Sequence, residues 1–311
     1  MRVDVTIVIV NWNTRDILRH CLRTIYEQTR GIEFEVIVVD NASIDGSAEM
    51  VRQDFPQAIL QVNRTNAGYA AANNQGMKVS RGRYVLVLNS DTLILDRAIE
   101  KMVDFADAHP QAGVLGCRVR NPDGTLQPTC FMFPSALNSL LSALYLNKLF
   151  PHSRFFSREV MTWWDRGDVR EVEVVTGCFM LVRREALDEV GWMDERFFMY
   201  AEETDWCYRF RKAGWQVLFA PVAEIVHLGG QSTAKRSAEM LVQLRLSILK
   251  FVRKNQGPVA WAVVCFNTVL FFALRLPVWA VIRLLMPERR QQASIRMRAY
   301  WQGLRRVVFS Q

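Results

Sequence analysis

The sequence has few of the features that mark repeat proteins, disulfide-stabilised proteins or disordered chains. No segment of the 311 residues recurs at the period of a helical repeat protein. Hydrophobic residues make up 50% of the chain and low-complexity stretches are scarce, which excludes a disordered chain. The six cysteines are scattered and form no CxxC pair, so we expect reduced, mostly buried thiols without disulfides or a zinc site.

Two common phosphate-binding motifs are also missing. No GxGxxG follows the first apolar run, and no GxxxxGK[ST] occurs anywhere, which disfavours a dinucleotide-dependent oxidoreductase and a P-loop enzyme. The first apolar run is too short for the core of a signal peptide and predicts a first strand. A diphosphate ligand would therefore need another means of binding, such as a divalent metal.

Short apolar runs alternate with amphipathic stretches over the first 120 residues. The run Phe34–Asp40 has β-branched residues on both faces, as a buried parallel strand requires. This alternation predicts an α/β fold with a doubly wound, mostly parallel sheet. The predicted strands are Val5–Val10, Phe34–Asp40, Ile59–Val62, Tyr84–Leu88, Val114–Cys117 and Gln216–Phe219. The predicted helices are Thr14–Gln28, Ser47–Asp54, Ala70–Val79, Ala98–Ala108, Arg184–Val190, 203–213 and 235–254.

The end of the chain differs from the rest in charge. Residues 235–311 contain fourteen lysines and arginines and two acids, so this tail carries +12, whereas residues 1–234 carry −4. A basic tail on a mildly acidic body indicates an anionic partner for the tail alone. The candidates are nucleic acid and an anionic membrane surface.

The tail also holds a long apolar stretch. Pro258–Leu274 is interrupted only by Asn267 and Thr268, and arginines follow it. Its seventeen residues are at the short limit for a membrane span, and both flanks are basic, against the positive-inside rule. We predict a hydrophobic hairpin at 257–286 that anchors the protein at a membrane surface. A buried helical pair in a soluble domain and a transmembrane hairpin are the alternatives.

Polar side chains follow three of the predicted strands. Asn11 follows the first strand, Asp40 ends the second, and Asn89 and Asp91 follow the run Tyr84–Leu88. Because ligands of parallel α/β sheets bind beyond the carboxyl ends of the strands, these residues are candidate ligand contacts. A turn or helix-capping role is the alternative for each of them.

A second group of candidates lies later in the chain. Glu202, Glu203 and Asp205 crowd three carboxylates into four residues, so at least one is expected to have a raised pKa and to suit general-base catalysis. Favourable placement at a helix N-terminus is the alternative. His227 follows another strand and could share a divalent metal with Asp91, although a lone histidine is more often structural.

Seven motifs in order resemble those of the inverting family 2 glycosyltransferases, and especially the bacterial rhamnosyltransferase-like branch. They cover roughly residues 3–235 and read VVDNAS (38–43), NxGYAAANN (66–74), LNSDT (88–92), NPDGTLQ (121–127), TGCFMLVRR (176–184), FFMYAEETDWCYRFRKAGW (197–215) and HLGGQS (227–232). The resemblance implies a GT-A catalytic domain over residues 1–234. It also implies a nucleotide-diphosphate sugar donor, with dTDP-rhamnose suggested by the branch, and transfer to a glycan or lipid-linked glycan.

The resemblance assigns roles to individual residues. Asp40 would contact the base or ribose and Asn66 would help to hold the nucleotide, with Asn11 and Asn89 beside them. Asp91 stands at the last aspartate of the family's DXD metal motif, and His227 matches a further position proposed as a ligand of Mg²⁺ or Mn²⁺. Asn89 replaces the first aspartate of that motif, which weakens the expected metal binding.

The resemblance also implies the base and the sugar pocket. Glu203 matches the second residue of the family's Glu-Asp pair, so it is the expected catalytic base, with Asp205 as the second choice. The donor and acceptor pocket is expected to include Tyr69, Asn73, Tyr200, Glu202, Trp163 and Trp164. The two tryptophans and the two tyrosines have plain packing as their alternative role.

Three other functions were considered. A processive polysaccharide synthase would have a QxxRW motif and several transmembrane helices, and this chain has no QxxRW. A nucleic-acid-binding protein is suggested by the basic tail alone, and no nucleic-acid motif is recognisable, so no nucleic-acid partner is expected. A catalytically impaired scaffold is suggested by Asn89. We expect an active enzyme at the cytoplasmic face of the inner membrane, bound peripherally or monotopically.

Overall fold

The computed structural model describes residues 3–229 and 237–309, which form two compact units. The first unit comprises the described residues of Met1–Phe131, Trp164–Phe198 and Glu202–Ser232, and the second comprises those of Met132–Trp163, Met199–Ala201 and Thr233–Gln311. This division differs from the predicted boundary at residue 234, because Met132–Trp163 belongs to the same unit as the C-terminal helices. The last three residues of the HLGGQS motif lie outside the described residues.

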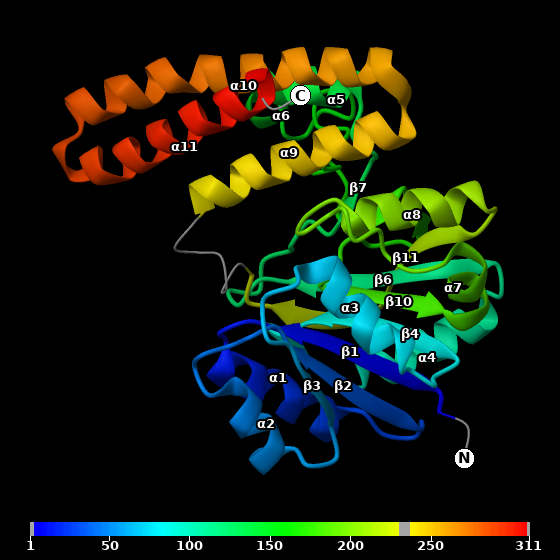
Figure 1. Cartoon of the computed structure of the whole chain (residues 1–311). Helices are drawn as coiled ribbons and strands as arrows, with labels where there is room; N and C mark the ends of the chain where they lie inside the picture. Colours follow the sequence, from blue (N-terminus) through cyan, green and yellow to red (C-terminus); the bar gives the residue numbers. More distant parts are fainter. Residues whose placement is uncertain (1–2, 230–236, 310–311) are drawn as a thin grey trace. The chain divides into compact units, whose positions relative to one another are not determined.

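The first unit is built on a mixed, mostly parallel sheet with the strand order β3-β2-β1-β4-β10-β6-β11-β5 (Figure 1). Strands β1 to β4 run parallel to one another, whereas β10 lies antiparallel between β4 and β6. The main strands are β1 (Val5–Asn11), β2 (Phe34–Asp40), β3 (Ile59–Val62), β4 (Tyr84–Asn89), β5 (Thr92–Ile94), β6 (Ala112–Arg120), β10 (Phe179–Arg183) and β11 (Gln216–His227). The short strands are β7 (Cys130–Phe131), β8 (Arg170–Glu171) and β9 (Val174–Val175).

Helices cover both faces of this sheet, as a doubly wound fold requires. Helices α1, α2 and α4 enclose the larger core on one face, which includes Ile7, Leu22 and Met102, and α3 covers Ile37 and Val39 on the other. The helices of this unit are α1 (Arg15–Gln28), α2 (Ser47–Asp54), α3 (Tyr69–Lys78), α4 (Ala98–Ala108), α7 (Arg184–Val190) and α8 (Glu202–Lys212). The predicted elements of the first 120 residues are confirmed to within a few residues.

Strand β11 is longer than predicted, and its extension matters for the site. The prediction ended at Phe219, but the strand continues to His227 through an irregularity between Ala220 and Glu224. Pro221 lies within this irregularity, where a residue without a backbone N–H is tolerated in a sheet. The extension pairs antiparallel with β5 and aligns His227 with Thr92, the residue after Asp91.

The second unit is helical. Its helices are α5 (Ala136–Ala143), α6 (Leu146–Leu149), α9 (Ser237–Asn255), α10 (Gly257–Leu285), the 3₁₀ turn Pro287–Arg289 and α11 (Arg290–Phe309). Helix α10 packs against α5, α9 and α11 (Figure 1). The predicted hairpin at 257–286 is wrong in form, because these residues make one helix that continues through Pro277. The reversal comes instead at Pro287–Arg289, after which α11 packs back on α10.

Arg275 fastens α10 to α5. Its guanidinium donates to the carbonyls of Ser142 at 2.9 Å and Ala143 at 3.1 Å, which lie at the C-terminal end of α5. The same group lies over the ring of Phe271, 3.5 Å from its centroid. Burial lowers the pKa of Arg275 to about 10, so the side chain stays charged at neutral pH. An arginine inside the apolar stretch is thus explained by packing within this unit.

Candidate active site

The parallel register brings the predicted strand-end residues together. Asn11 lies beside Asp40 on the paired strands β1 and β2, and Val10 lies beside Asn89 on β4. The Asn11 side-chain amide donates to Asp40 Oδ1 at 3.0 Å. The carboxyl ends of these strands therefore form one polar edge, as the sequence predicted.

Asp40 shapes the loop that follows β2. Its other oxygen, Oδ2, accepts from the backbone N–H of Ser43 at 2.9 Å, and only 1% of the residue is exposed. Asn13 holds the far side of the loop, because its Oδ1 accepts from the Ile44 N–H at 2.8 Å. The backbone of Asn13 and Ala42 is left-handed, with φ of 54° and 64°. A role for Asp40 in binding the nucleotide stays a prediction.

Asn66 belongs to an amide network at the start of α3. Its Oδ1 accepts from the Asn41 side chain and from the backbone N–H of Gly68, both at 2.9 Å. Gly68 has a φ of 88°, and a Cβ there would lie 2.6 Å from the carbonyl oxygen of Phe198. Glycine is therefore required where the chain turns into α3, and this turn positions Tyr69.

The two predicted metal ligands meet at the edge of the sheet. Nε2 of His227 lies 3.0 Å from Oδ1 of Asp91, and both side chains are largely buried. Nδ1 of His227 lies 2.6 Å from Oε1 of Gln127, whose amide nitrogen donates to Asn121 at 2.8 Å. Because this oxygen can only accept, Nδ1 carries a proton, and Nε2 is the ring nitrogen that faces the Asp91 carboxylate.

This donor set fits a divalent cation. A carboxylate and an imidazole nitrogen that face the same point are suitable ligands, and Gln127 fixes the ring as partners of metal-bound histidines do. Within residues 3–229 and 237–309, no cluster of three acidic, histidine or cysteine side chains lies at metal-binding distance. The protein thus offers two ligands here, which agrees with Mg²⁺ or Mn²⁺ sites that use phosphate oxygens and water for the rest.

Tyr69 connects this pair to the rest of the site. Its hydroxyl lies 2.9 Å from Oδ1 of Asn89, and the amide nitrogen of Asn89 lies 3.2 Å from Nε2 of His227. The same hydroxyl lies 3.1 Å from the carbonyl oxygen of Gly177, where a Cβ would approach it to 2.8 Å. Asn89, which stands where the family motif has an aspartate, therefore connects Tyr69 to His227 through its side-chain amide.

The predicted acid pair begins helix α8. Burial raises the pKa of Glu203, and burial together with the neighbouring Glu203 charge raises the pKa of Glu202 well above its ordinary range. One oxygen of each carboxyl group, Oε2, is buried without a hydrogen-bond partner among the described residues. Glu202 is 3% exposed whereas Glu203 is half-buried, so Glu203 is the member that a substrate can reach.

The charges of the acid pair act on the side chains of Tyr69 and Cys178. Burial and the charges of Glu202 and Glu203 raise the pKa of Tyr69 well above its ordinary range. Burial raises the pKa of the Cys178 thiol to about 12, and the charges of Asp91 and Glu203 both contribute. The acid pair and the Asp91–His227 pair therefore lie around the same small set of side chains.

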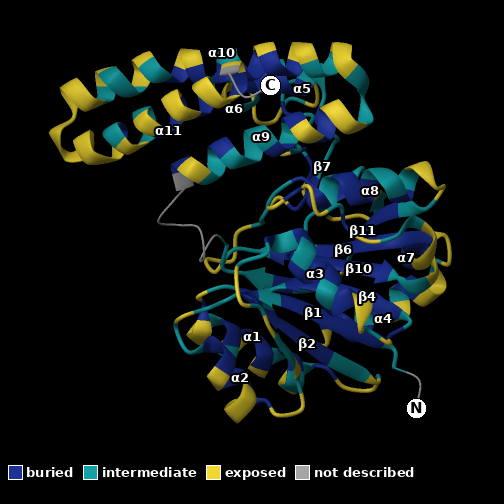
Figure 2. Ribbon diagram, viewed as in Figure 1, coloured by how far each residue is buried: buried dark blue, intermediate teal, exposed yellow. Residues whose placement is uncertain are grey.

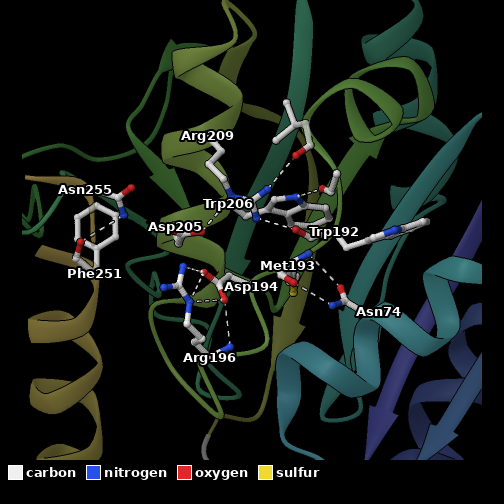
Figure 3. A network of polar contacts seen from close by, with 12 residues as sticks. Asn74, Trp192, Met193, Asp194, Arg196, Asp205, Trp206, Arg209, Phe251 and Asn255 are labelled. Carbon is white, nitrogen blue, oxygen red and sulfur yellow. Dashed lines mark hydrogen bonds and ion pairs between the residues drawn. The ribbon is translucent and has the colours of Figure 1, made fainter. Parts of the chain in front are cut away.

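Asp205 has a different role from its neighbours. It is fully buried, and its Oδ2 accepts from Nε of Arg209 at 3.0 Å (Figure 3). Arg209 also donates to the carbonyls of Val190 and Trp192, and the indole of Trp206 donates to Gly191 at 2.8 Å. This network joins α8, the helix that begins with the acid pair, to the turn at the end of α7. We therefore assign Asp205 to positioning, and Glu203 keeps the role of base.

The other predicted pocket residues are either buried in the first unit or belong to the second unit. Asn73 is fully buried in α3, where its amide donates to the Tyr69 carbonyl. Trp164 is 4% exposed and packs edge to face on Phe219, so it belongs to the core and is not available to stack on a sugar. Trp163 and Tyr200 fall in the second unit, and their pocket roles stay predictions.

Gln127 is a site residue that the sequence reasoning did not single out. It lies within NPDGTLQ, one of the seven motifs, so its position in a motif was the available signal. Its partner His227 is one hundred residues away, and only the long strand β11 brings the two together.

The fold, the polar strand ends and the acid pair agree with a match to a family model. Residues 6–191 match the model described as glycosyl transferase family 2. The chain belongs to this family, and its fold is GT-A. It is a glycosyltransferase of the rhamnosyltransferase-like type, as the motifs predicted.

Individual relatives agree with this assignment. The chain is 30% identical over 242 residues to the N-acetylglucosaminyl-diphospho-decaprenol L-rhamnosyltransferase of Mycobacterium tuberculosis, covering 73% of this chain and 78% of that protein. It is 24% identical to the low-salt glycan biosynthesis hexosyltransferase Agl10 of Haloferax volcanii, covering 72% and 67%. The mannosyltransferase PcManGT of Pyrobaculum calidifontis, solved with GDP-Man and Mn²⁺, superposes with a TM-score of 0.55 at 18% identity, covering 100% and 88%.

Proposed function

We propose that this enzyme transfers one sugar from a nucleotide-diphosphate donor to a hydroxyl group of a lipid-linked glycan, with inversion at the anomeric carbon. The observation that supports this most is the set of contacts from Tyr69 through Asn89 to His227 and Asp91, together with the charges of the acid pair, which help to raise the pKa of Tyr69. It pairs a base of raised pKa with ligands for a diphosphate-bound cation at one edge of the sheet.

In this proposal Glu203 is the base. Its carboxylate takes the proton of the acceptor hydroxyl while that oxygen attacks the anomeric carbon from the face opposite the diphosphate. The new carbon–oxygen bond forms as the bond to the diphosphate breaks, the nucleoside diphosphate leaves, and the proton stays on Glu203. The pKa of Glu202 is raised further than that of Glu203, so Glu202 is the member of the pair that holds a proton more strongly.

Asp91 and His227 would hold a divalent cation, and Gln127 would keep the histidine ring in the required tautomer. When bound, such a cation neutralises charge on the departing diphosphate. Asp40, Asn11 and Asn66 would hold the nucleoside at the ends of β1 and β2. Each of these assignments follows from donor chemistry and position.

The donor and acceptor are proposed from the relatives. The Mycobacterium tuberculosis protein is named as a rhamnosyltransferase acting on a decaprenol-linked N-acetylglucosaminyl diphosphate. We therefore propose dTDP-rhamnose as the first donor to test and a prenol-linked saccharide as the acceptor. Such an acceptor is confined to a membrane, so we propose that the basic tail binds the cytoplasmic membrane surface and not nucleic acid.

A transfer assay tests the proposal directly. The full chain is incubated with Mn²⁺, a short-chain prenyl diphosphate saccharide and a panel of dTDP-, UDP- and GDP-sugars, and products are identified by mass and by NMR. We expect one added sugar from a single donor, with its anomeric configuration inverted. Retention of configuration would contradict the base assignment, and several added sugars per acceptor would indicate a processive enzyme. Glu203→Gln is the negative control, and Asp165→Asn, an exposed substitution, is the matched control.

A further inference from the structure

The exposed side of helix α10 is apolar along its whole length. Its exposed residues recur at three- and four-residue intervals from Val259 to Phe266 and again from Ala273 to Leu285, which is the spacing of one helix face. Figure 2 shows exposed residues recurring along α10. We call this face the apolar stripe; it consists of Val259, Ala262, Val263, Phe266, Ala273, Leu274, Pro277, Val278, Val281, Leu284 and Leu285. Arg283, in the last turn, is the one charged residue among the exposed positions of this helix.

Apart from Arg283, the polar residues Asn267, Thr268 and Arg275 of α10 lie on its buried side. The Asn267 amide donates to Ser139 Oγ and to the Ala136 carbonyl, both at 2.9 Å. The Thr268 hydroxyl donates to the Val264 carbonyl one turn earlier, and the Arg275 guanidinium donates to the Ser142 carbonyl at the end of α5. In a water-soluble unit the polar residues of a surface helix face solvent. Helix α10 shows the reverse arrangement, with satisfied polar groups inside and apolar side chains outside.

Several stripe residues are large and well exposed. Phe266 is 66% exposed, Val259 77% and Leu285 74%. At 29 residues, α10 has a length of about 43 Å, so the stripe is far longer than an isolated surface patch. Basic residues flank both ends, with Arg253 and Lys254 before it, and Arg289 and Arg290 after it.

We propose that α10 lies in the plane of an anionic lipid bilayer, with its apolar stripe among the acyl chains and its flanking arginines and lysine at the headgroups. The inference deepens the membrane association proposed above by naming the face, its orientation and the lipid charge. It does not depend on the identity of the donor or the acceptor.

The helices packed against α10 distinguish an α10 that lies in the plane of the membrane from an α10 that crosses it. Helices α9 and α11 pack along α10 within the second unit. If α10 crossed the bilayer, its packed neighbours would carry their exposed charges into the hydrocarbon core, where each is strongly unfavourable. These charges include Glu239, Lys250, Arg298, Arg305 and Arg306. An in-plane α10 inserts only its stripe, because these helices cover its other sides.

Vesicle flotation tests the apolar stripe. The full chain is mixed with vesicles of phosphatidylcholine alone or with phosphatidylglycerol, and the floating fraction is measured. We expect tight binding to the anionic vesicles, weaker binding to the neutral ones, and a loss of at least about tenfold in partitioning for Phe266→Asp with Val278→Asp. The matched control is Gln53→Asp with Gln57→Asp, which adds the same charge at exposed positions of the first unit, outside the stripe and its basic flanks.

The control pair should float within about twofold of the wild-type protein. Both double variants should keep their helical circular dichroism and their nucleotide binding, because all four positions are exposed and none belongs to the polar edge at the ends of β1, β2 and β4. Equal flotation of the stripe and control variants would overturn the proposal. Loss of flotation with intact nucleotide binding separates this inference from the proposed activity.

Cysteine labelling tests the orientation. Lys254→Cys and Glu288→Cys place thiols at exposed positions just before and just after α10, and the native cysteines of the described chain are all buried. The protein is bound to the outside of sealed vesicles and treated with a membrane-impermeant maleimide. We expect both thiols to react fully. Protection of one thiol until the vesicles are lysed would show that α10 spans the bilayer and would overturn the in-plane proposal.

Discussion

Replacing the base is the change with the most specific expected result. Glu203→Gln keeps the size of the side chain and removes its ability to accept a proton, because the amide does not take up a proton near neutral pH. General-base catalysis contributes about 10²- to 10⁴-fold, so we expect kcat to fall by that factor, or about 3 to 5 kcal/mol of transition-state stabilisation. Nucleotide affinity should be unchanged, since the carboxylate acts on the acceptor.

The pH profile gives a second readout of the same change. Burial raises the pKa of Glu203, so the wild-type rate should fall as the pH drops through a value above that of an ordinary glutamate. Glu202→Gln should keep this acid limb, because burial is the main cause of the Glu203 shift. Steady-state rates of both variants between pH 4.5 and 9 measure this difference.

Replacing either acid by glutamine should stabilise the folded protein, although Glu203→Gln lowers its activity. Both acids have raised pKa values in the folded protein, so their protonation favours folding at low pH and this contribution is lost as the pH rises through the folded values. Each Glu→Gln variant should therefore melt at a higher temperature than the wild-type protein at pH 8, with a smaller difference at pH 4.5. Asp205→Asn is the contrasting variant, because it breaks the ion pair with Arg209 and should melt lower. Full activity in Glu203→Gln together with lost activity in a folded Asp205→Asn would refute the assignment of the base.

Three further predictions concern the support of the site. Gln127→Leu removes the acceptor from Nδ1 of His227 and should weaken Mn²⁺ affinity by about 10- to 100-fold, whereas Gln127→Glu restores an acceptor and should recover most of it, as calorimetry would show. Gly177→Ala places a methyl group 2.8 Å from the Tyr69 hydroxyl and should lower kcat by up to about tenfold with little change in helical content; unchanged kinetics would contradict this. Arg209→Met leaves Asp205 buried without its ion-pair partner and should cost about 3 to 5 kcal/mol of unfolding free energy in urea titrations; a loss below about 1 kcal/mol would show that the network is dispensable.

The sheet could be predicted because local pattern and tertiary environment agree there. The sequence of Phe34–Asp40 predicts a buried parallel strand, and β2 indeed pairs with β1 and β3 while helices cover both of its faces. The polar ends of these strands then meet by register alone. The same argument correctly brought Asn11, Asp40 and Asn89 to one edge.

The parts of the site that depend on pairing between residues far apart in the sequence could not be predicted. Strand β11 was expected to end at Phe219, and the pairing of its extension with β5 has no local signal in the sequence. The contact between Gln127 and His227 follows from that pairing. Asp205 was a plausible base by spacing, and only the position of Arg209 one helical turn later shows its ion pair.

The tail was predicted to be helical and apolar, but its predicted shape was wrong. A hairpin at 257–286 requires a reversal of the chain within the apolar stretch. The protein instead continues the helix, because packing against α5, α9 and α11 offsets the lost hydrogen bond and Arg275 finds carbonyl partners on α5. Sequence alone does not show which neighbours supply those contacts.

Calorimetric titration of the full chain with dTDP, with and without Mn²⁺, tests most directly the claim that Asp91 and His227 hold a metal-bound diphosphate. The account predicts metal-dependent binding of dTDP, with UDP, GDP and CDP weaker, and loss of the metal dependence in Asp91→Ala. Equal binding with and without Mn²⁺, unchanged in that variant, would contradict it.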